Sequence, residues 1–439
     1  MTVESTSNPW PNGWSTMSKI KLLNIITPQG TAGELSKGSQ FSFAYASAQA
    51  PREVSLVMPY DPTPTVSNVL HPIFDMNVPE GFLADQIKRR MAKHMQVDEM
   101  RLLSVIGGNQ IGRLSYENPV EISVPVKAQV GLQEILSADT SQGVFDFLVD
   151  TYFESGISGV QPKVLVPDLD KLTGSRKTML SSDLIVKSGA DEYAHLAQNE
   201  FLCLEAARLA GLQTPRFWLA DSGDLFVMER FDLTQSGRLG FEDMAVLLGL
   251  NKDPHDNYKY SQSYETLAAV ISEVCRHGDA LRELERFFAY VCLSVMVRNG
   301  DAHLKNFGVL YTHPGARETV QLAPVFDVTT TTVYEHYSPK SGQSLVDRTL
   351  AIKMNKVKAY PDRQQLIEFG RKHCGVSSPG VIIERIAEAM SEALRTHQPR
   401  IDAALFSTMQ KEWDAGRAVA LHDSVASGMR RKPVRKPLH

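Results

Sequence analysis

The residues best suited to chemistry lie in one segment, VRNGDAHLKNFGVL at 297–310. Asp301 and Asn306 are five positions apart there, a D-x-x-x-x-N spacing. In catalytic loops for phosphoryl transfer, an Asp in the first position accepts the proton of the acceptor hydroxyl, and the Asn ligates Mg²⁺. We therefore predict Asp301 as the catalytic base and Asn306 as a metal ligand. His303, inside the same loop, either joins the chemistry or braces the loop by hydrogen bonds.

A second metal ligand should follow about 20–30 residues later, at the end of a strand. The segment APVFDVTTT at 323–331 supplies Asp327 after an apolar run. A strand-end Asp alone is equally typical of a turn. Together with Asp301 and Asn306, however, Asp327 completes a set of oxygen ligands that suits Mg²⁺.

Phosphate binding requires a cation and backbone N–H donors. Lys187, in the strand-like segment DLIVKS at 183–188, fits the cation, and Glu200 in the next helix would pair with it. The alternative for Lys187 is a solvated lysine at a strand end. The loop SGISGVQPK at 155–163 offers Gly156 and Gly159, whose N–H groups could approach phosphates. Its spacing is not that of a Walker A loop, and by itself it could be a flexible turn.

The segment MERFD at 228–232 follows a strand and precedes the helical half of the chain. A hinge between lobes would hold an adenine there through backbone groups. The alternative is that Glu229 and Arg230 form an ordinary surface pair.

The first part of the chain, from 18 to 120, predicts a compact α+β unit without a chemical motif, interpreted as an interaction or scaffold module. Short apolar runs bounded by Gly and Pro are typical of strands, and one polar–apolar stretch is typical of a helix. The strands are expected at 20–26, 41–46 and 54–58, the helix at 82–95, and a strand–turn–strand at 102–116.

The middle of the chain, 121–232, alternates strands with a helix, the layout of a small nucleotide-clamping lobe. Helices are predicted at 144–153 and 199–212, with strands at 183–188, 215–220 and 225–232.

The region 233–425 is predicted to be mainly helical. A helical spacing of apolar residues predicts one long helix with a buried face. That face comprises Leu281, Leu284, Phe287, Phe288, Val291 and Val295. Further helices are expected at 381–394 and within 401–420, between a loose leader at 1–17 and a basic, flexible tail at 426–439.

Composition excludes several classes of protein. The 439 residues are enough for two or three cores, and 43% hydrophobic with 22% charged residues is typical of a soluble globular protein. The net charge of −4 argues against a polycation that coats nucleic acid. Four scattered cysteines favour a reducing cytoplasm over a disulfide framework. No apolar stretch reaches the roughly 18 residues of a membrane span, so we expect a cytoplasmic protein without membrane contact.

Taken together, the ordered motifs resemble the HipA family of bacterial serine/threonine kinases, the toxin halves of type II toxin–antitoxin modules. The resemblance covers about 18 to 420. Its motifs are NVPEG (77–81), SGxSGVQPK (155–163), IVK (185–187), NE (199–200), ERFD (229–232), FEDMAVLLGL (241–250), NGDAHLKNF (299–307) and APVFD (323–327).

This resemblance implies an α+β, two-lobed protein-kinase-like fold with an extra N-terminal α/β subdomain and an all-helical C-terminal lobe. It implies that Asp301 is the base, that Asn306 and Asp327 hold Mg²⁺, and that Lys187 binds phosphates. The other residues that it implies for ATP binding are Gly156, Gly159, Gln161, Lys163, Glu229, Arg230 and Phe231. The segment 241–260 corresponds to an activation-loop-like region, where a substrate contact and a packed helix are both open.

The resemblance also implies partners. The usual antitoxin is a small helix-turn-helix protein, HipB, through which DNA is reached indirectly. The usual target is a serine of an aminoacyl-tRNA ligase, glutamate–tRNA ligase, whose phosphorylation stops translation and growth.

One position departs from the family pattern. Members commonly carry an autophosphorylated serine in the glycine-rich loop where this chain has Gly156. Ser158 is the preferred substitute and Ser155 the alternative. A phosphate there adds about −2 charge, which would repel ATP and compete for its N–H donors.

Two other functions compete with a protein kinase. NGDAHLKN also matches the G-D-x-H-x-x-N pattern of small-molecule phosphotransferases for aminoglycosides or choline. A catalytically inert co-repressor subunit is the second alternative, supported by the basic segment 430–439, although a solvated terminus explains that segment as well. The N-terminal module and the SGxSGVQPK and FEDMAVLLGL segments favour the protein kinase.

Overall fold

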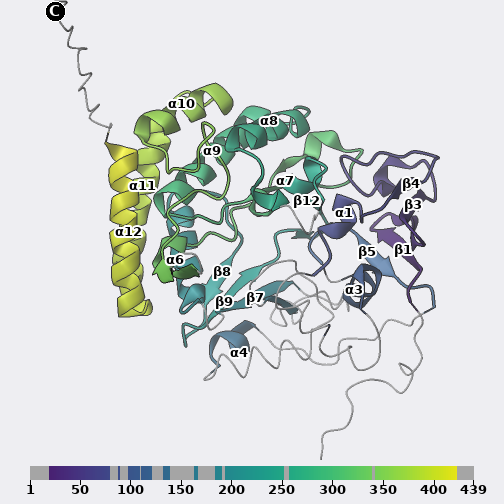
Figure 1. Ribbon diagram of the computed structural model, residues 1–439, viewed down its shortest axis with the longest axis horizontal. Coiled ribbons are helices and arrows are strands. Elements are labelled where there is room, and N and C mark those ends of the chain that lie inside the picture. Colours follow the sequence, from purple (N-terminus) through teal and green to yellow (C-terminus); the bar gives the residue numbers. More distant parts are fainter. Residues whose placement is uncertain are drawn as a thin grey trace, which may run out of the picture.

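The computed structural model describes residues 19–79, 88, 97–108, 110–120, 132–138, 163–166, 183–189, 193–251, 257–338 and 342–422. Outside these lie the leader at 1–17, most of the helix predicted at 82–95, the helix predicted at 144–153, and the tail at 426–439. The glycine-rich loop lies outside too, with Ser155, Gly156, Ser158, Gly159 and Gln161. Mixed helices and sheets match the α+β class that the sequence predicts (Figure 1).

The N-terminal unit is a five-stranded antiparallel sheet in the order β4-β3-β2-β1-β5, seen at the right of Figure 1. Its elements are β1 (Leu22–Thr27), β2 (Gly30–Lys37), β3 (Phe41–Tyr45), β4 (Thr65–Ser67) and β5 (Ser115–Glu117), with α1 (Pro72–Asp75) and α3 (Glu99–Ile106). Alternating side chains of β1, such as Leu23 and Ile25, are fully buried, which is the period-2 pattern of a sheet with one covered face.

Two predictions in this unit are wrong. Residues 102–106 form part of helix α3 instead of a strand, because Asp98 caps its N-terminus and Gly107, at φ 56°, ends it. A short apolar run does not distinguish the two states. Residues 54–58 form only an isolated bridge, Ser55 to Met58. Ser55 and Leu56 instead donate hydrogen bonds to the carboxylate of Glu242, 2.8 and 2.7 Å long, so their polar groups need no neighbouring strand.

The second sheet carries the expected lysine. It is four-stranded, in the order β6-β7-β9-β8, and helix α6 packs against it. Its elements are β6 (Lys163–Val166), β7 (Leu184–Ser188), β8 (Phe217–Leu219), β9 (Leu225–Glu229) and α6 (Leu196–Leu209), with the short α4 (Leu132–Leu136) nearby. Every residue of β7 is buried, which explains its continuous apolar run.

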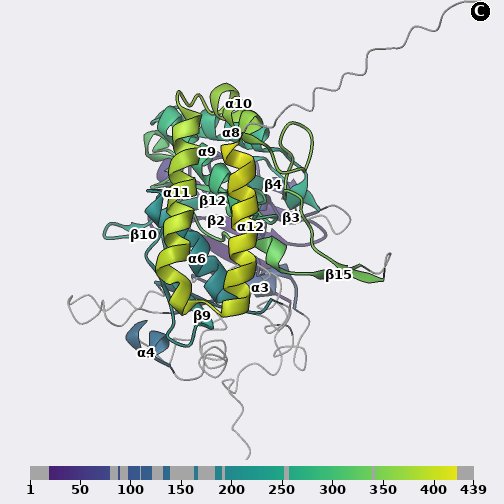
Figure 2. The same cartoon turned by 90° about the vertical axis from the view of Figure 1, so that its left-hand side faces the viewer.

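The remaining region contains the helices that the sequence predicts, but it is not the all-helical lobe that the family resemblance implies, because short antiparallel strands pair between its helices. Its helices are α7 (Met244–Leu247), α8 (Tyr264–Val274), α9 (Ala280–Met296), α10 (Arg363–His373), α11 (Pro379–His397) and α12 (Ala403–Leu421). Its strands are β10 (Leu233–Thr234), β11 (Gly237–Arg238), β12 (Gly240–Asp243), β13 (Gly308–Tyr311), β14 (Gln321–Leu322), β15 (His336–Ser338) and β16 (Gln343–Leu345). Figure 2 shows α11 and α12 side by side on one face of the molecule, with α6 behind them.

Helix α9 is the central element of this lobe. Leu284, Phe287, Phe288, Val291 and Val295 are all buried, as the spacing predicts. Leu281 is an error in that prediction: it is 68% exposed, because it lies in the first turn of the helix, just after the N-cap Asp279. All four cysteines are buried and free.

Two buried carboxylates join the N-terminal unit to the rest of the chain. Glu242 on β12 accepts from Ser55, Leu56 and the Tyr311 hydroxyl, and burial raises its pKa to about 7. Asp232 accepts from the Gly112 N–H at 2.8 Å and pairs with Arg230. Among the described residues, no helix is long and apolar enough to cross a membrane.

Candidate active site

Helix α9 delivers the loop that carries Asp301. The chain leaves the helix through Arg298, whose φ of 60° reverses its direction. The loop is then fixed by two hydrogen bonds: Gly300 N–H donates to Thr331 Oγ1 at 2.7 Å, and Asp301 N–H donates to Asn299 Oδ1 at 3.0 Å. Asn299 is buried, so the turn is anchored to the protein interior. The side chain of Asp301 nevertheless remains 53% exposed.

The neighbours of Asp301 are aromatic. The hydroxyl of Tyr260 donates to Asp301 Oδ1 at 2.6 Å, and His303 Nε2 lies 3.9 Å from the same oxygen. The rings of Tyr260 and His303 meet edge to face, 5.2 Å apart. Burial lowers the pKa of His303 to about 4, so its imidazole is neutral at physiological pH. A neutral ring at this distance carries no charge to the carboxylate and is too far to hydrogen-bond to it. The ring Nδ1 is buried without a hydrogen-bond partner among the described residues, so the imidazole does not brace the loop by the hydrogen bonds that the sequence suggested.

Asn306 and Asp327 lie next to each other. Asn306 ends a 3₁₀ turn at Leu304–Asn306, and its Nδ2 donates to the main-chain oxygen of Asp327 at 3.3 Å. The Tyr290 hydroxyl bridges the two segments by contacting Asn306 O at 3.2 Å and Phe326 O at 2.5 Å. Asp327 has a left-handed φ of 57°, a conformation unusual for a non-glycine residue.

Lys187 stands between two carboxylates. Its Nζ lies 2.5 Å from Glu200 Oε1 and contacts Asp327 Oδ1 as well. Lys187 is 2% exposed and Glu200 1%. Burial by itself would lower the pKa of Lys187, but the two carboxylates outweigh it and the pKa is raised. Lys187 is therefore a buried, charged ammonium, not the solvated lysine of the alternative interpretation.

The hinge residues have separate partners. Glu229 pairs with Arg216 at the surface. Arg230 is 5% exposed and binds the buried Asp232 at 2.5 Å, so Glu229 and Arg230 do not form a surface pair. Phe231 stacks on Phe326, with centroids 5.1 Å apart and planes at 25°. Lys163 begins β6 directly opposite Lys187.

These residues fit Mg²⁺ shared with phosphates. Asn306 Nδ2 donates to Asp327 O, and no hydrogen bond from a described residue reaches Asn306 Oδ1, which is left available to a cation. One amide oxygen and one carboxylate, from Asp327, are the small ligand set that Mg²⁺ uses when phosphates and water complete its shell. Within the described ranges, no cluster of three or more His, Cys, Asp or Glu side chains could cage a metal.

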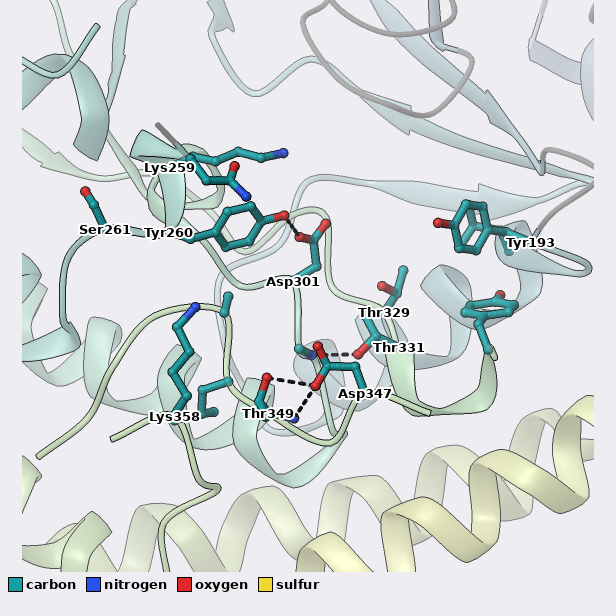
Figure 3. Close-up of a pocket in the computed structure, with 16 residues that line it drawn as sticks. Tyr193, Lys259, Tyr260, Ser261, Asp301, Thr329, Thr331, Asp347, Thr349 and Lys358 are labelled. Carbon is teal, nitrogen blue, oxygen red and sulfur yellow. Dashed lines mark hydrogen bonds between the residues drawn. The ribbon is translucent and has the colours of Figure 1, made fainter. Parts of the chain in front are cut away.

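A cavity of about 670 Å³ opens beside Asp301 (Figure 3). Its wall includes the aromatic rings of Tyr193, Tyr260 and Tyr334. Its charged residues are Lys259, Lys358, Asp301 and Asp347. The sequence predicted possible substrate contact for the segment 241–260 as a whole. Of the cavity side chains named above, it identified only Asp301 individually. Lys358 in particular lies 57 positions from Asp301, and no motif links them.

Two family models match the chain. The model described as "HipA-like C-terminal domain" matches 155–397, more than half of the chain, and "HipA N-terminal domain" matches 23–117.

Two relatives and one solved structure illustrate the similarity. "Putative kinase Y4dM" of Sinorhizobium fredii is 28% identical over 34% of this chain and 38% of its own length. "Serine/threonine-protein kinase toxin HipA" of Shewanella oneidensis is 22% identical over 54% of this chain and 57% of its length. The chain thus matches less than two thirds of either relative. A solved structure of the Shewanella oneidensis HipA, HipB and operator DNA complex aligns with a TM-score of 0.65 at 19% identity, covering 91% of this chain and 96% of that one.

Proposed function

The chain belongs to the HipA family, and we propose that it is an ATP- and Mg²⁺-dependent serine/threonine kinase that serves as the toxin of a HipBA-type module. The observation that carries this proposal is the contact of the buried Lys187 with Glu200 and Asp327, together with the hydrogen bond from Asn306 to Asp327. Asp301 lies in the same loop as Asn306, five positions before it. A buried lysine paired with one buried and one partly exposed carboxylate is an arrangement that clusters at functional sites, because burying paired charges adds little to stability.

Each residue then has a role in phosphoryl transfer. Lys187 binds the phosphates of ATP, and Glu200 keeps its ammonium in place. Asn306 and Asp327 hold Mg²⁺, which when bound neutralises charge on the phosphates. Asp301 accepts the proton of the acceptor hydroxyl as the hydroxyl oxygen bonds to the γ-phosphorus and ADP leaves. Backbone groups of 229–232 and Phe231 hold adenine, and the loop at 155–163 covers the phosphates through Gly156, Gly159, Gln161 and Lys163.

The charges around the cavity support a protein acceptor. Two lysines, Lys259 and Lys358, balance Asp301 and Asp347 there. A polycationic small molecule such as an aminoglycoside would require an excess of acids, because each buried ammonium needs a carboxylate partner. Through the family, we propose an aminoacyl-tRNA ligase as the target, with glutamate–tRNA ligase first.

The proposed partner is a HipB-like antitoxin. The similar Shewanella structure contains HipA, HipB and operator DNA. A chain with a net charge of −4 is better suited to reach DNA through such a partner than by itself. Phosphorylation of Ser158, or of Ser155, would silence the kinase by placing negative charge where ATP phosphates bind.

The decisive experiment incubates the purified chain with ATP, Mg²⁺ and glutamate–tRNA ligase, and follows phosphate transfer. Wild type should phosphorylate the ligase on serine but not kanamycin, and the Asp301→Gln variant should do neither. Mass spectrometry of the chain itself locates any phosphate on Ser155 or Ser158. Transfer that survives Asp301→Gln would refute the assigned base, and transfer to kanamycin alone would refute the protein acceptor.

A further inference from the structure

The cavity beside Asp301 contains a contact that the proposed mechanism does not use. Tyr260, in the 3₁₀ turn Tyr258–Tyr260, lies 41 positions before Asp301 and donates its hydroxyl to Asp301 Oδ1 at 2.6 Å. Figure 3 shows the hydroxyl meeting one carboxylate oxygen, while the other points away from the ring. Among the described residues, the hydrogen bonds to this carboxylate end at Oδ1.

The Tyr260 ring is itself held on several sides. The ammonium of Lys259 lies 5.1 Å from its centroid and that of Lys358 5.5 Å. The buried ring of His303 contacts it edge to face. Cation–π and edge-to-face contacts are each worth about 0.5–1 kcal/mol, so together they restrict the ring to one orientation.

The hydroxyl of Tyr260 is a permanent donor. Burial and the adjacent Asp301 carboxylate raise the pKa of Tyr260 far above its ordinary value, so the phenol keeps its proton at physiological pH. A phenol that cannot ionise can donate to a carboxylate but cannot replace it as a base.

We propose that Tyr260 is a positioning residue for the reaction: it holds Asp301 through Oδ1 so that Oδ2 is presented to the acceptor hydroxyl in the cavity. This inference rests on the proposed kinase activity. Asp301 is half exposed, and its carboxylate has no other side-chain donor within 3.5 Å among the described residues. Without Tyr260, the exposed side chain would sample several rotamers, and only some would present an oxygen to the acceptor.

A gate is the competing interpretation of the same contact. If the Tyr260 hydroxyl occupied the place of the acceptor hydroxyl, it would have to leave before reaction. The neighbours argue against this, because Lys259, Lys358 and His303 would lose their contacts when the ring moved. The two interpretations predict rate changes of opposite sign.

The test compares wild type with Tyr260→Phe, which removes only the hydroxyl. Tyr60→Phe serves as the matched control, since Tyr60 is a half-buried tyrosine of the N-terminal unit. The readouts are phosphate release from ATP to water and transfer to dephosphorylated casein. A lost hydrogen bond to a charged group corresponds to a roughly 10- to 100-fold fall in kcat for Tyr260→Phe. The KM for ATP should stay within about twofold, and Tyr60→Phe should behave as wild type.

An unchanged or increased kcat would overturn the proposal, as would an effect confined to KM or phosphate found on Tyr260 itself. Crystal structures of both proteins give a readout that does not depend on activity. Asp301 should occupy one rotamer in wild type and more than one, or a different one, in Tyr260→Phe. An identical rotamer in the variant overturns the positioning role even if wild type turns over no ATP. Absence of turnover with the expected rotamer change would instead count against the proposed kinase activity alone.

Discussion

The two halves of the candidate site are built in different ways. Around Lys187, charge is buried: the lysine and Glu200 are almost fully covered, and Asp327 pairs with the same ammonium. Around Asp301, charge is exposed: the carboxylate faces a cavity and is held by one phenol. A buried ion pair depends on every partner for stability, whereas an exposed carboxylate can be removed at little structural cost. Stability and catalysis should therefore respond differently to changes in the two halves.

The largest effect is expected from Lys187→Met. It leaves Glu200 buried without its cation and should lower the free energy of unfolding by about 3–5 kcal/mol, as well as abolish phosphate transfer. Urea unfolding monitored by circular dichroism measures this. The double variant Lys187→Met with Glu200→Leu should regain part of the stability but none of the activity. A single variant within about 1 kcal/mol of wild type would contradict the buried-charge account.

Asp301→Asn should show the opposite pattern. Loss of a general base costs about 10²- to 10⁴-fold in kcat. The side chain is half exposed, so the unfolding free energy should stay within about 0.5 kcal/mol. Phosphate release from ATP measures the change in kcat, and urea unfolding of the same preparation measures the change in unfolding free energy. A large stability loss here would remove the contrast between the two halves.

The pH dependence of stability should contain a contribution from His303, the buried neighbour of Asp301. The folded pKa of His303, about 4, lies below its ordinary value of 6.5. The unfolded chain therefore binds more protons between these values, so stability is complete above pH 6.5 and falls as the pH drops toward 4. About 2 kcal/mol should be lost between pH 6.5 and 5. Glu242, whose folded pKa is raised to about 7, contributes in the opposite direction over the same pH range, so the contribution of His303 is measured as a difference. In urea titrations at these two pH values, wild type should lose about 2 kcal/mol of stability relative to His303→Gln.

The smallest effect is expected at the rim of the buried half. Glu229 pairs with Arg216, whose side chain is 67% exposed, and such surface pairs contribute about 0.2–1 kcal/mol. If residues 229–232 contact adenine only through backbone groups, Glu229→Ala should change the KM for ATP by less than about threefold. Phe231→Leu, which removes the stack on Phe326, is the companion variant and should raise that KM more. A larger effect of Glu229→Ala would mean that its carboxylate contacts the nucleotide.

Much of the architecture could be predicted from local pattern. The buried face of α9, apart from Leu281, follows from helical spacing, and β7 follows from a short apolar run. The same kind of run led to a wrong strand prediction at 102–106, where Asp98 caps a helix instead. It failed again at 54–58, because the partner that satisfies Ser55 and Leu56 is Glu242, 187 positions from Ser55.

By itself, the sequence determined which chemical groups this protein has: a lysine, a helix glutamate, and the Asp301, Asn306 and Asp327 set, with the family to which they belong. Motifs of a few residues carry that information, because spacing within a loop or strand end is local. Only the tertiary structure decided that Lys187 meets Asp327 across 140 positions, and that Tyr260 takes one oxygen of Asp301. Such contacts depend on how whole elements pack, which no local spacing specifies.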